Sequence, residues 1–256
     1  MGKASRRKRE RVIARERAPV APATRLSSRL AAALALAAVL AGGAIGFIET
    51  ARPQPRPAAL VGAAEVARAY AALPQRGQAL GRADAPVTMA VYLDPQCPYC
   101  GEWERTAMPE LVARFVRTGM LRVEVRGLRF VGPDSDRALR LLHAAALQDR
   151  FFQATAILYR NQGEENTGWV SDGYLRSLAA SVPGADAARL LADRDSPAVD
   201  AGIAADERAA AAEGVTGTPS VYLGRTGGPL GKVELTALDA SAVAPAIRQL
   251  AREARR

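Results

Sequence analysis

The pattern of hydrophobic and polar positions divides the chain into an N-terminal part and a C-terminal part of different character. Residues 30–48 (LAAALALAAVLAGGAIGFI) form a run without a single charged side chain. A helix of that length rises about 30 Å, which is the hydrocarbon thickness of a bilayer. The run therefore predicts one transmembrane helix. A cleaved signal peptide, giving a secreted protein, is the alternative.

Beyond residue 80 the pattern predicts alternating strands and helices. Residues 87–93 (VTMAVYL) are apolar on both faces, which is typical of a strand buried on both sides. An amphipathic helix is expected next. Its apolar side chains recur every four residues, at Trp103, Ala107, Leu111 and Phe115. We expect Pro109 to kink or interrupt this helix and Gly119 to end it.

The second half of the chain continues the same alternation. Residues 121–130 alternate between apolar and charged side chains and predict a half-exposed strand. A block of helices follows, and Asp134 or Ser135 is the expected cap of the first. Further helices are expected at 151–158, 172–182, 185–194 and 197–213. Strand character returns in a hairpin formed by 220–223 and 232–235, before a closing helix near 243–251.

This pattern predicts four regions along the chain. They are a basic cytoplasmic tail at 1–29, the transmembrane helix at 30–48, a linker with a candidate short helix at 49–79, and a folded domain at 80–256 with a helical insertion at about 133–213. The order of elements in the domain is typical of an α/β fold in which helices cover a mixed sheet.

Charge supports this topology. Residues 1–29 carry ten Lys or Arg against two Glu, whereas the remaining residues carry 25 Lys or Arg against 24 Asp or Glu. Basic residues before a membrane span predict a cytoplasmic N-terminus and an exported C-terminal domain. Because the domain itself is near neutral, the formal charge of +9 does not indicate nucleic-acid binding.

The two cysteines of the chain form one motif, Cys97-Pro98-Tyr99-Cys100, between the expected buried strand and the expected helix. The first turn of a helix offers unpaired N–H groups and a positive dipole end, which stabilise a thiolate at Cys97. Pro98 suits the first helical position because its missing N–H has no partner there. Cys100 lies one turn further and can attack a mixed disulfide at Cys97. The motif thus indicates thiol–disulfide exchange.

Other interpretations of the two cysteines have less support. A zinc site needs further ligands, and the chain has a single histidine, His143, which we interpret as a helix-face residue without a catalytic part. An inert disulfide across so small a loop would stabilise little. No motif indicates a metal, nucleotide or organic cofactor. Glu102 and Glu104 lie near the start of the helix, where they favour its N-terminus and can oppose ionisation of Cys97.

A second motif, Gly217-Thr218-Pro219-Ser220, leads into the strand expected at 220–223. Its Thr218-Pro219 bond is a candidate cis peptide, with an ordinary strand-entry proline as the alternative. Together, the runs YLDPQCPYCGEWERTAMPEL and GVTGTPS, with the helical block between them, resemble the DsbA-like thiol:disulfide oxidoreductases of the thioredoxin superfamily. More narrowly, the chain is similar to membrane-anchored bacterial members. The resemblance covers roughly residues 80–254.

The resemblance implies a thioredoxin fold with a helical insertion and a role for each matching residue. Cys97 and Cys100 match the catalytic pair, and Pro98 and Tyr99 match the dipeptide that sets its reduction potential. Asp94 matches an acid that often precedes the first cysteine, in a capping or acidity role. The substrate-binding pair is Thr218 and Pro219. Tyr99 departs from the family pattern, because the familiar periplasmic oxidant carries histidine there.

The expected function is therefore thiol:disulfide exchange on exported proteins that contain cysteines, promoting disulfide formation with a membrane redox partner. Two alternatives stay open. Tyr99 in place of histidine also suits a membrane-tethered reductase of the same fold. A non-catalytic module could instead bind extended peptides beside the sheet edge near Pro219.

Overall fold

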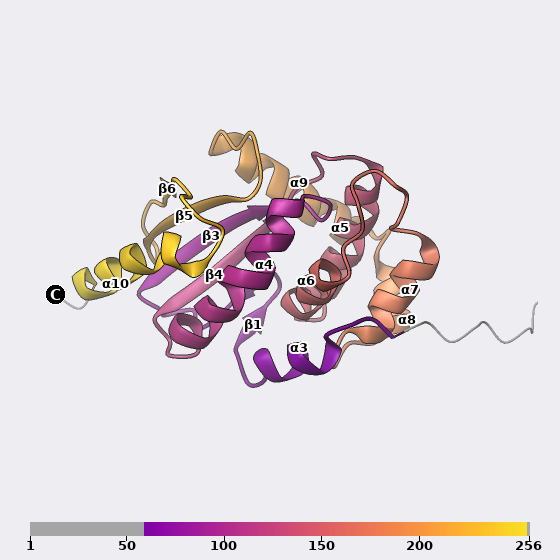
Figure 1. Cartoon of the computed structure of the whole chain (residues 1–256), viewed down its shortest axis with the longest axis horizontal. Coiled ribbons are helices and arrows are strands. Elements are labelled where there is room, and N and C mark those ends of the chain that lie inside the picture. The colour runs from indigo at the N-terminus through magenta and orange to yellow at the C-terminus, as the bar shows by residue number, and fades with distance from the viewer. Residues whose placement is uncertain (1–58, 255–256) are drawn as a thin grey trace, which may run out of the picture. The chain divides into compact units, whose positions relative to one another are not determined.

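The computed structural model describes residues 59–254. These residues contain a mixed six-stranded sheet with helices packed around it (Figure 1). Its order is β1-β2-β4-β3-β5-β6. The strands are β1 (Gln75–Arg76), β2 (Ala79–Leu80), β3 (Val87–Leu93), β4 (Leu121–Gly127), β5 (Ser220–Arg225) and β6 (Gly231–Val233). Strand β3 is parallel to β4 and antiparallel to β5, so the sheet is mixed as the element order predicts.

Helices precede, separate and follow these strands. They are α3 (Ala63–Ala69), α4 (Pro98–Leu111), α5 (Pro133–Ala146), α6 (Phe151–Arg160), α7 (Asp172–Ser181), α8 (Ala187–Asp193), α9 (Pro197–Ala212) and α10 (Ala244–Glu253). A π-helical turn, η1 (Val112–Val116), extends α4, and a 3-10 turn, η2 (Ala240–Ala242), precedes α10. Helices α5 to α9 lie between β4 and β5 in sequence, where the helical insertion is expected (Figure 1).

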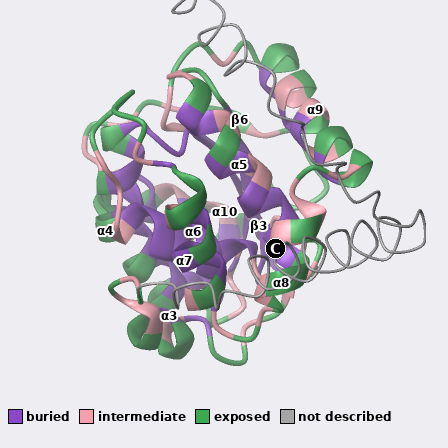
Figure 2. Ribbon diagram, turned by 90° about the vertical axis from the view of Figure 1, so that its right-hand side faces the viewer, coloured by how far each residue is buried: buried purple, intermediate pink, exposed green. Residues whose placement is uncertain are grey.

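Strand β3 is buried on both faces, which confirms the interpretation of its continuous apolar pattern. One face joins the main core, through Val87, Met89, Val91 and Leu93. The other face packs with a smaller cluster that includes Tyr92, Tyr222 and Ala210 of α9. Buried positions gather around the strands and on the inner sides of the helices, while α9 exposes its outer side (Figure 2). The centre of the sheet is therefore a rigid support for the segments that leave it.

The helix after β3 is irregular near the proline that was expected to kink or interrupt it. Pro109 lies inside α4, and the helix widens into the π-helical turn η1 directly after Leu111. A hydrogen bond from Arg117 N to Val112 O at 2.9 Å, which spans five residues, marks the widening. Met120 N then donates to Phe115 O at 2.8 Å and Gly119 N donates to Val116 O at 2.9 Å, the pattern that closes a helix at a left-handed residue. Gly119 ends the helix as predicted, with a φ of 72° in the left-handed region that favours glycine.

Two expectations for the next elements are corrected. Strand β4 alternates as predicted but ends at Gly127, before the expected limit at residue 130. Neither Asp134 nor Ser135 caps α5, because Pro133 already occupies the first helical turn and Gly132 is the N-cap. Proline starts a helix readily because its φ is fixed near the helical value. The hydroxyl of Ser135 has a different role, described with the site below.

Only part of the N-terminal region for which the sequence makes predictions lies within the described residues. Helix α3 is the short helix expected in the linker, but β1 and β2 follow it and add two antiparallel strands to the edge of the sheet. Each has two residues, too few to show a periodic pattern. The transmembrane helix expected at 30–48 lies outside the described residues. Within residues 59–254, no helix is both long and apolar enough to span a bilayer.

A buried carboxylate fixes α9 against the sheet. Asp206 Oδ2 on α9 accepts hydrogen bonds from Gly127 N at 2.9 Å and Gln78 Nε2 at 2.6 Å. It also lies 3.2 Å from His143 Nε2 on α5. Gly202 permits this approach, because a Cβ there would lie 2.6 Å from the His143 ring. His143 thus belongs to the packing of α5, α9 and the sheet, which agrees with its interpretation as a structural residue.

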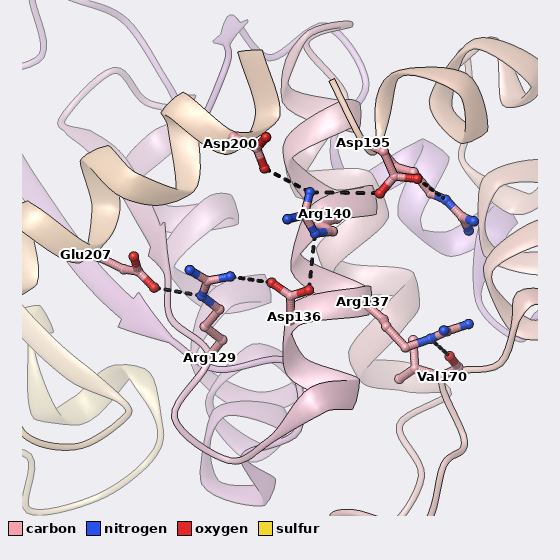
Figure 3. A network of polar contacts seen from close by, with 9 residues as sticks. Arg129, Asp136, Arg137, Arg140, Val170, Asp195, Asp200 and Glu207 are labelled. Atoms are coloured by element: carbon pink, nitrogen blue, oxygen red, sulfur yellow. Dashed lines mark hydrogen bonds and ion pairs between the residues drawn. The ribbon is translucent and has the colours of Figure 1, made fainter. Parts of the chain in front are cut away.

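A surface network of ion pairs joins the same elements (Figure 3). Arg129, in the segment after β4, contacts Asp136 on α5 and Glu207 on α9. Arg140 on α5 binds Asp136 at 3.1 Å and Asp200 on α9 at 2.9 Å. Partly exposed pairs of this kind each contribute little to stability. We therefore attribute the attachment of α9 to the sheet mainly to the buried contacts of Asp206.

We predict that Asp206→Ala lowers the free energy of unfolding by about 2–4 kcal/mol, because it leaves buried donors without an acceptor. Asp200→Ala is the matched control, since Asp200 lies on the same helix with 58% of its side chain exposed. It should change the free energy by less than about 1 kcal/mol. Urea unfolding measures both variants, and equal losses would contradict the role of the buried carboxylate.

Candidate active site

The pairing of β3 with β5 brings the two sequence motifs together. Tyr92, near the end of β3, is in register with Ser220, the first residue of β5. Because the strands are antiparallel, the C-terminal end of β3 and the N-terminal end of β5 lie side by side. The segment after β3 and the segment before β5 therefore leave the sheet at the same end. The Cys97 thiol consequently lies 3.3 Å from the carbonyl oxygen of Thr218, to which it donates a hydrogen bond. The Thr218-Pro219 peptide bond is cis, as the sequence suggested.

Cys97 occupies the N-cap of α4, and Pro98 occupies the first helical position as predicted. The structure holds both cysteines as free thiols, and 6% of Cys97 is exposed. The pKa of Cys97 falls from 9.0 to about 6, chiefly through a hydrogen bond from Cys100, with further contributions from the Thr218 side chain and from the backbone N–H groups of Tyr99 and Cys100. Desolvation opposes this decrease. Cys97 is therefore largely ionised at neutral pH and suited to nucleophilic attack.

Cys100 has the opposite character. It is fully buried one turn along α4, and desolvation raises the pKa of its thiol well above the usual value of 9.0. The nearby Cys97 raises it further. The backbone N–H of Asp94 points to the Cys100 sulfur at 3.5 Å. The pair thus combines one reactive, marginally exposed sulfur with one protonated, buried sulfur.

The dipeptide between the cysteines faces solvent. Pro98 is exposed, and Tyr99 is 62% exposed, which makes it one of the most exposed large hydrophobic side chains among the described residues. Such a side chain beside a reactive thiol is available to contact another molecule. Tyr99 therefore belongs to the outer surface of the site, while Cys100 belongs to its buried base.

The Asp94 side chain holds the segments around the motif together. It is fully buried, and its Oδ1 accepts hydrogen bonds from Gln96 N at 2.8 Å and Ser135 Oγ at 2.6 Å. Its Oδ2 accepts a third from Val131 N at 3.0 Å. The carboxylate caps the turn before Cys97, as one of the two expected roles requires. It also ties that turn to the start of α5, a link that the sequence did not reveal.

The neighbouring side chains complete this support. Tyr159 on α6 donates from its hydroxyl to the Asp94 carbonyl at 2.9 Å, and Gln96 Nε2 donates to Ser135 Oγ at 3.1 Å. Gln162, after α6, contacts the backbone of the motif. Nothing in the sequence pattern indicates these contacts of Tyr159, Gln96 and Gln162, because they depend on tertiary packing.

Glu104 is buried, which its sequence position did not suggest. It lies on α4 one turn beyond Cys100, is only 3% exposed, and has a buried Oε1 without a partner among the described residues. Desolvation raises its pKa from 4.5 to about 8, opposed by the charge of Arg160. It is buried and mainly uncharged, so the expected role of a charged Glu104 in favouring the helix N-terminus is corrected. At neutral pH it is mainly protonated.

A family model described as thioredoxin matches residues 75–227. The curated "Probable disulfide bond formation protein D" of Bacillus cereus is 29% identical over 149 residues, which span 57% of this chain and 69% of that protein.

Two solved structures share the fold. Oxidised BdbD from Bacillus subtilis has a TM-score of 0.60 at 20% identity, covering 70% of this chain and 97% of that one. A thioredoxin-like oxidoreductase from Silicibacter pomeroyi has a TM-score of 0.53 at 28% identity, covering 71% and 92%. The matched family region contains both the cysteine pair and the Thr218-Pro219 segment.

The buried acid gives a pH-dependent prediction. A carboxyl with a pKa of about 8 in the folded protein and 4.5 as its ordinary value makes folding less favourable as pH rises between those values. Glu104→Gln removes this loss, so its stability relative to wild type should increase with pH over that window. The limiting slope is about 1.4 kcal/mol per pH unit.

Denaturant unfolding at several pH values measures this difference, in which the titration of the cysteines largely cancels. Glu102→Gln on the exposed side of α4 is the control for replacing a glutamate on this helix. If the stability difference between Glu104→Gln and wild type is constant with pH, Glu104 is not a buried, protonated acid.

Proposed function

Because the chain belongs to the thioredoxin family and has the fold of its DsbA-like members, we propose that it promotes disulfide formation in exported proteins. It is a thiol:disulfide oxidoreductase, and its substrates are proteins with cysteines. The observation that carries the proposal is the contrast between its two sulfurs. Cys97 is marginally exposed and has a pKa of about 6, and Cys100 is fully buried with a raised pKa.

This contrast favours oxidation of a substrate. A thiolate at Cys97 stabilises the reduced enzyme, and an enzyme whose reduced form is stabilised is a stronger oxidant. It also makes Cys97 the better leaving group when a mixed disulfide is resolved by a substrate thiol. The buried Cys100 is shielded from bulky molecules. The outer Cys97 is therefore the sulfur that an incoming substrate thiolate attacks.

The exchange proceeds in two steps. A substrate thiolate attacks the Cys97 sulfur of the oxidised enzyme, which forms a mixed disulfide and releases Cys100 as a thiolate that takes up a proton. A second substrate thiolate then attacks the substrate sulfur of the mixed disulfide, which forms the substrate disulfide and releases the Cys97 thiolate. Two electrons pass from the substrate dithiol to the enzyme pair.

The remaining site residues support substrate binding and tuning in this proposal. The backbone of Thr218, beside Pro219, pairs with an extended substrate segment, and the exposed Tyr99 contacts it from the other side. Pro98 starts α4 and so contributes to the reactivity of Cys97. Asp94 positions the turn that carries Cys97. Support comes from the 3.3 Å contact between the Cys97 thiol and the Thr218 carbonyl.

We place the protein at the cell membrane. The uncharged run 30–48 and the basic tail 1–29 support a single-pass anchor with the catalytic domain outside the cytoplasm. A membrane redox partner then reoxidises the cysteine pair. N-terminal sequencing of the mature protein tests the anchor, and a start near residue 45 would show cleavage instead.

A disulfide reductase is the second candidate, and Tyr99 is the observation that favours it. The side chain at this position carries no charge beside Cys97, whereas a histidine could stabilise the thiolate further. The chemistry of the pair is the same in both directions. The reduction potential decides which direction is favoured.

We predict that Cys100→Ala, with Cys97 first converted to a mixed disulfide with glutathione, traps a mixed disulfide between Cys97 and a reduced, unfolded substrate protein. A substrate thiolate displaces glutathione from the Cys97 sulfur, and the intramolecular thiol that would reverse the step is absent. Non-reducing electrophoresis followed by mass spectrometry measures the adduct. Cys97→Ala is the control and should form none. A Cys100→Ala protein that forms no adduct with any disulfide or activated thiol would support a non-catalytic binding module.

We predict that the Cys97–Cys100 pair has a reduction potential between about −120 and −180 mV, the range of disulfide-forming enzymes. Equilibration of the 59–256 fragment with glutathione, read by thiol alkylation, measures it. A potential near about −270 mV, which is typical of thioredoxin, would overturn the oxidase direction in favour of the reductase.

A further inference from the structure

The segment between α6 and α7 contacts the backbone on which the first cysteine sits. Gln162, in this segment, donates from Nε2 to the carbonyl oxygen of Pro95 and to that of Cys97, each at 3.0 Å. Its side chain is half-buried. A single amide group therefore bridges the residues on both sides of Gln96. The turn that presents the Cys97 sulfur is fixed from outside α4.

Room for this amide exists because residue 101 is glycine. Gly101 N donates to the Cys97 carbonyl at 3.1 Å, the first bond of the helix. A Cβ at Gly101 would lie 2.2 Å from Gln162 Oε1 and 2.7 Å from Arg105 Nη1. Both atoms are the ends of flexible side chains. A larger residue at 101 would thus displace Gln162 before it disturbed the helix backbone.

Two further contacts hold the segment in place. The backbone N–H of Asn166 donates to Gln96 Oε1 at 2.8 Å, and Gln96 is almost fully buried. At the end of α6, Arg105 Nη1 on α4 donates to the Tyr159 carbonyl at 2.7 Å. The position of Gln162 is therefore set by contacts on either side of it, and its amide is held in place before any reaction takes place.

The electrostatic consequence concerns the Cys97 sulfur. The carbonyl oxygens of Pro95 and Cys97 carry partial negative charge in the turn that presents the Cys97 sulfur, which becomes negative on ionisation. The amide hydrogens of Gln162 place partial positive charge on both oxygens and fix their direction. Removing them leaves this negative charge uncompensated, which disfavours the thiolate.

We propose that Gln162 is a positioning residue, which fixes the backbone of Cys97 from the segment between α6 and α7 and thereby sets the reactivity of that thiol. This proposal rests on the proposed function, because it concerns the same cysteine pair. Gly101 is the residue that makes the contact sterically permissible. Neither residue touches the substrate in this proposal, so both act through Cys97.

The experiment titrates the thiolate of Cys97 by its ultraviolet absorbance in the reduced protein. Gln162→Leu keeps the size of the side chain and removes both donors. The expected result is an upward shift of about 0.5 to 1 pKa unit, a three- to tenfold change in the ionisation constant. The rate of attack on a small disulfide at pH 5 should fall with the thiolate population.

Gln148→Leu is the matched control. Gln148 also donates from its side-chain amide to a backbone carbonyl, that of Asp186 at 3.2 Å, but it follows α5 and contacts the segment before α8. This variant removes the same kind of hydrogen bond elsewhere in the fold. It should leave the Cys97 titration at the wild-type value.

Gly101→Ala provides a second route to the same effect. Alanine is the better helix former, so this variant should keep or increase the stability of the fold while raising the Cys97 pKa. The double variant Gly101→Ala/Gln162→Leu should show no further shift in the Cys97 pKa. Both changes remove the same contact, that of the Gln162 amide with the carbonyls of Pro95 and Cys97. If Gln162 had a purely structural role, the variants would change the stability of the fold and leave the pKa of Cys97 at its wild-type value.

Unchanged Cys97 titrations in both Gln162→Leu and Gly101→Ala would overturn the proposal, as would an equal shift in Gln148→Leu. Failure of the proposed function gives a different result. In that case the wild-type protein would not exchange with glutathione at all, and the titrations would still compare the variants.

Discussion

The antiparallel pairing of β3 with β5 is the constraint on which the site depends. It brings Cys97 and Thr218 within 3.3 Å although 121 positions separate them in the chain. A shift of one residue in this register would turn every side chain of β5 to the other face, which would remove Val221 and Leu223 from the main core. The packing that stabilises the sheet therefore also sets the geometry of the site.

Burial then gives the two cysteines different chemistry. The interior beneath α4 disfavours charge, which keeps Cys100 protonated and raises the pKa of Glu104 to about 8. The N-terminal end of the same helix is partly open to solvent and offers hydrogen bonds to Cys97, which lower its pKa to about 6. One helix turn thus separates an ionised sulfur from a protonated one. Neither residue type nor the spacing of the motif would alone create this difference.

Much of the fold could be predicted from local patterns. The apolar run of β3, the proline after Cys97 and the alternation in β4 each indicate one structure, because only near neighbours decide it. The site was less accessible to this reasoning. Its supporting contacts join Asp94 to the start of α5 and Gln162 to the turn before α4, and such pairings depend on tertiary packing.

Helices α5 to α9 separate the two halves of the site in sequence, and this has a consequence for how the protein matures. The contacts between β3 and β5 are of high contact order, so the loop closure that forms them is slow compared with the folding of single helices. During synthesis, the cysteine motif emerges long before β5. Until that strand has emerged, the nascent chain carries a pair of thiols without the carbonyl that faces Cys97. The contact between Cys97 and the Thr218 carbonyl therefore requires a strand that is synthesised well after the cysteine motif.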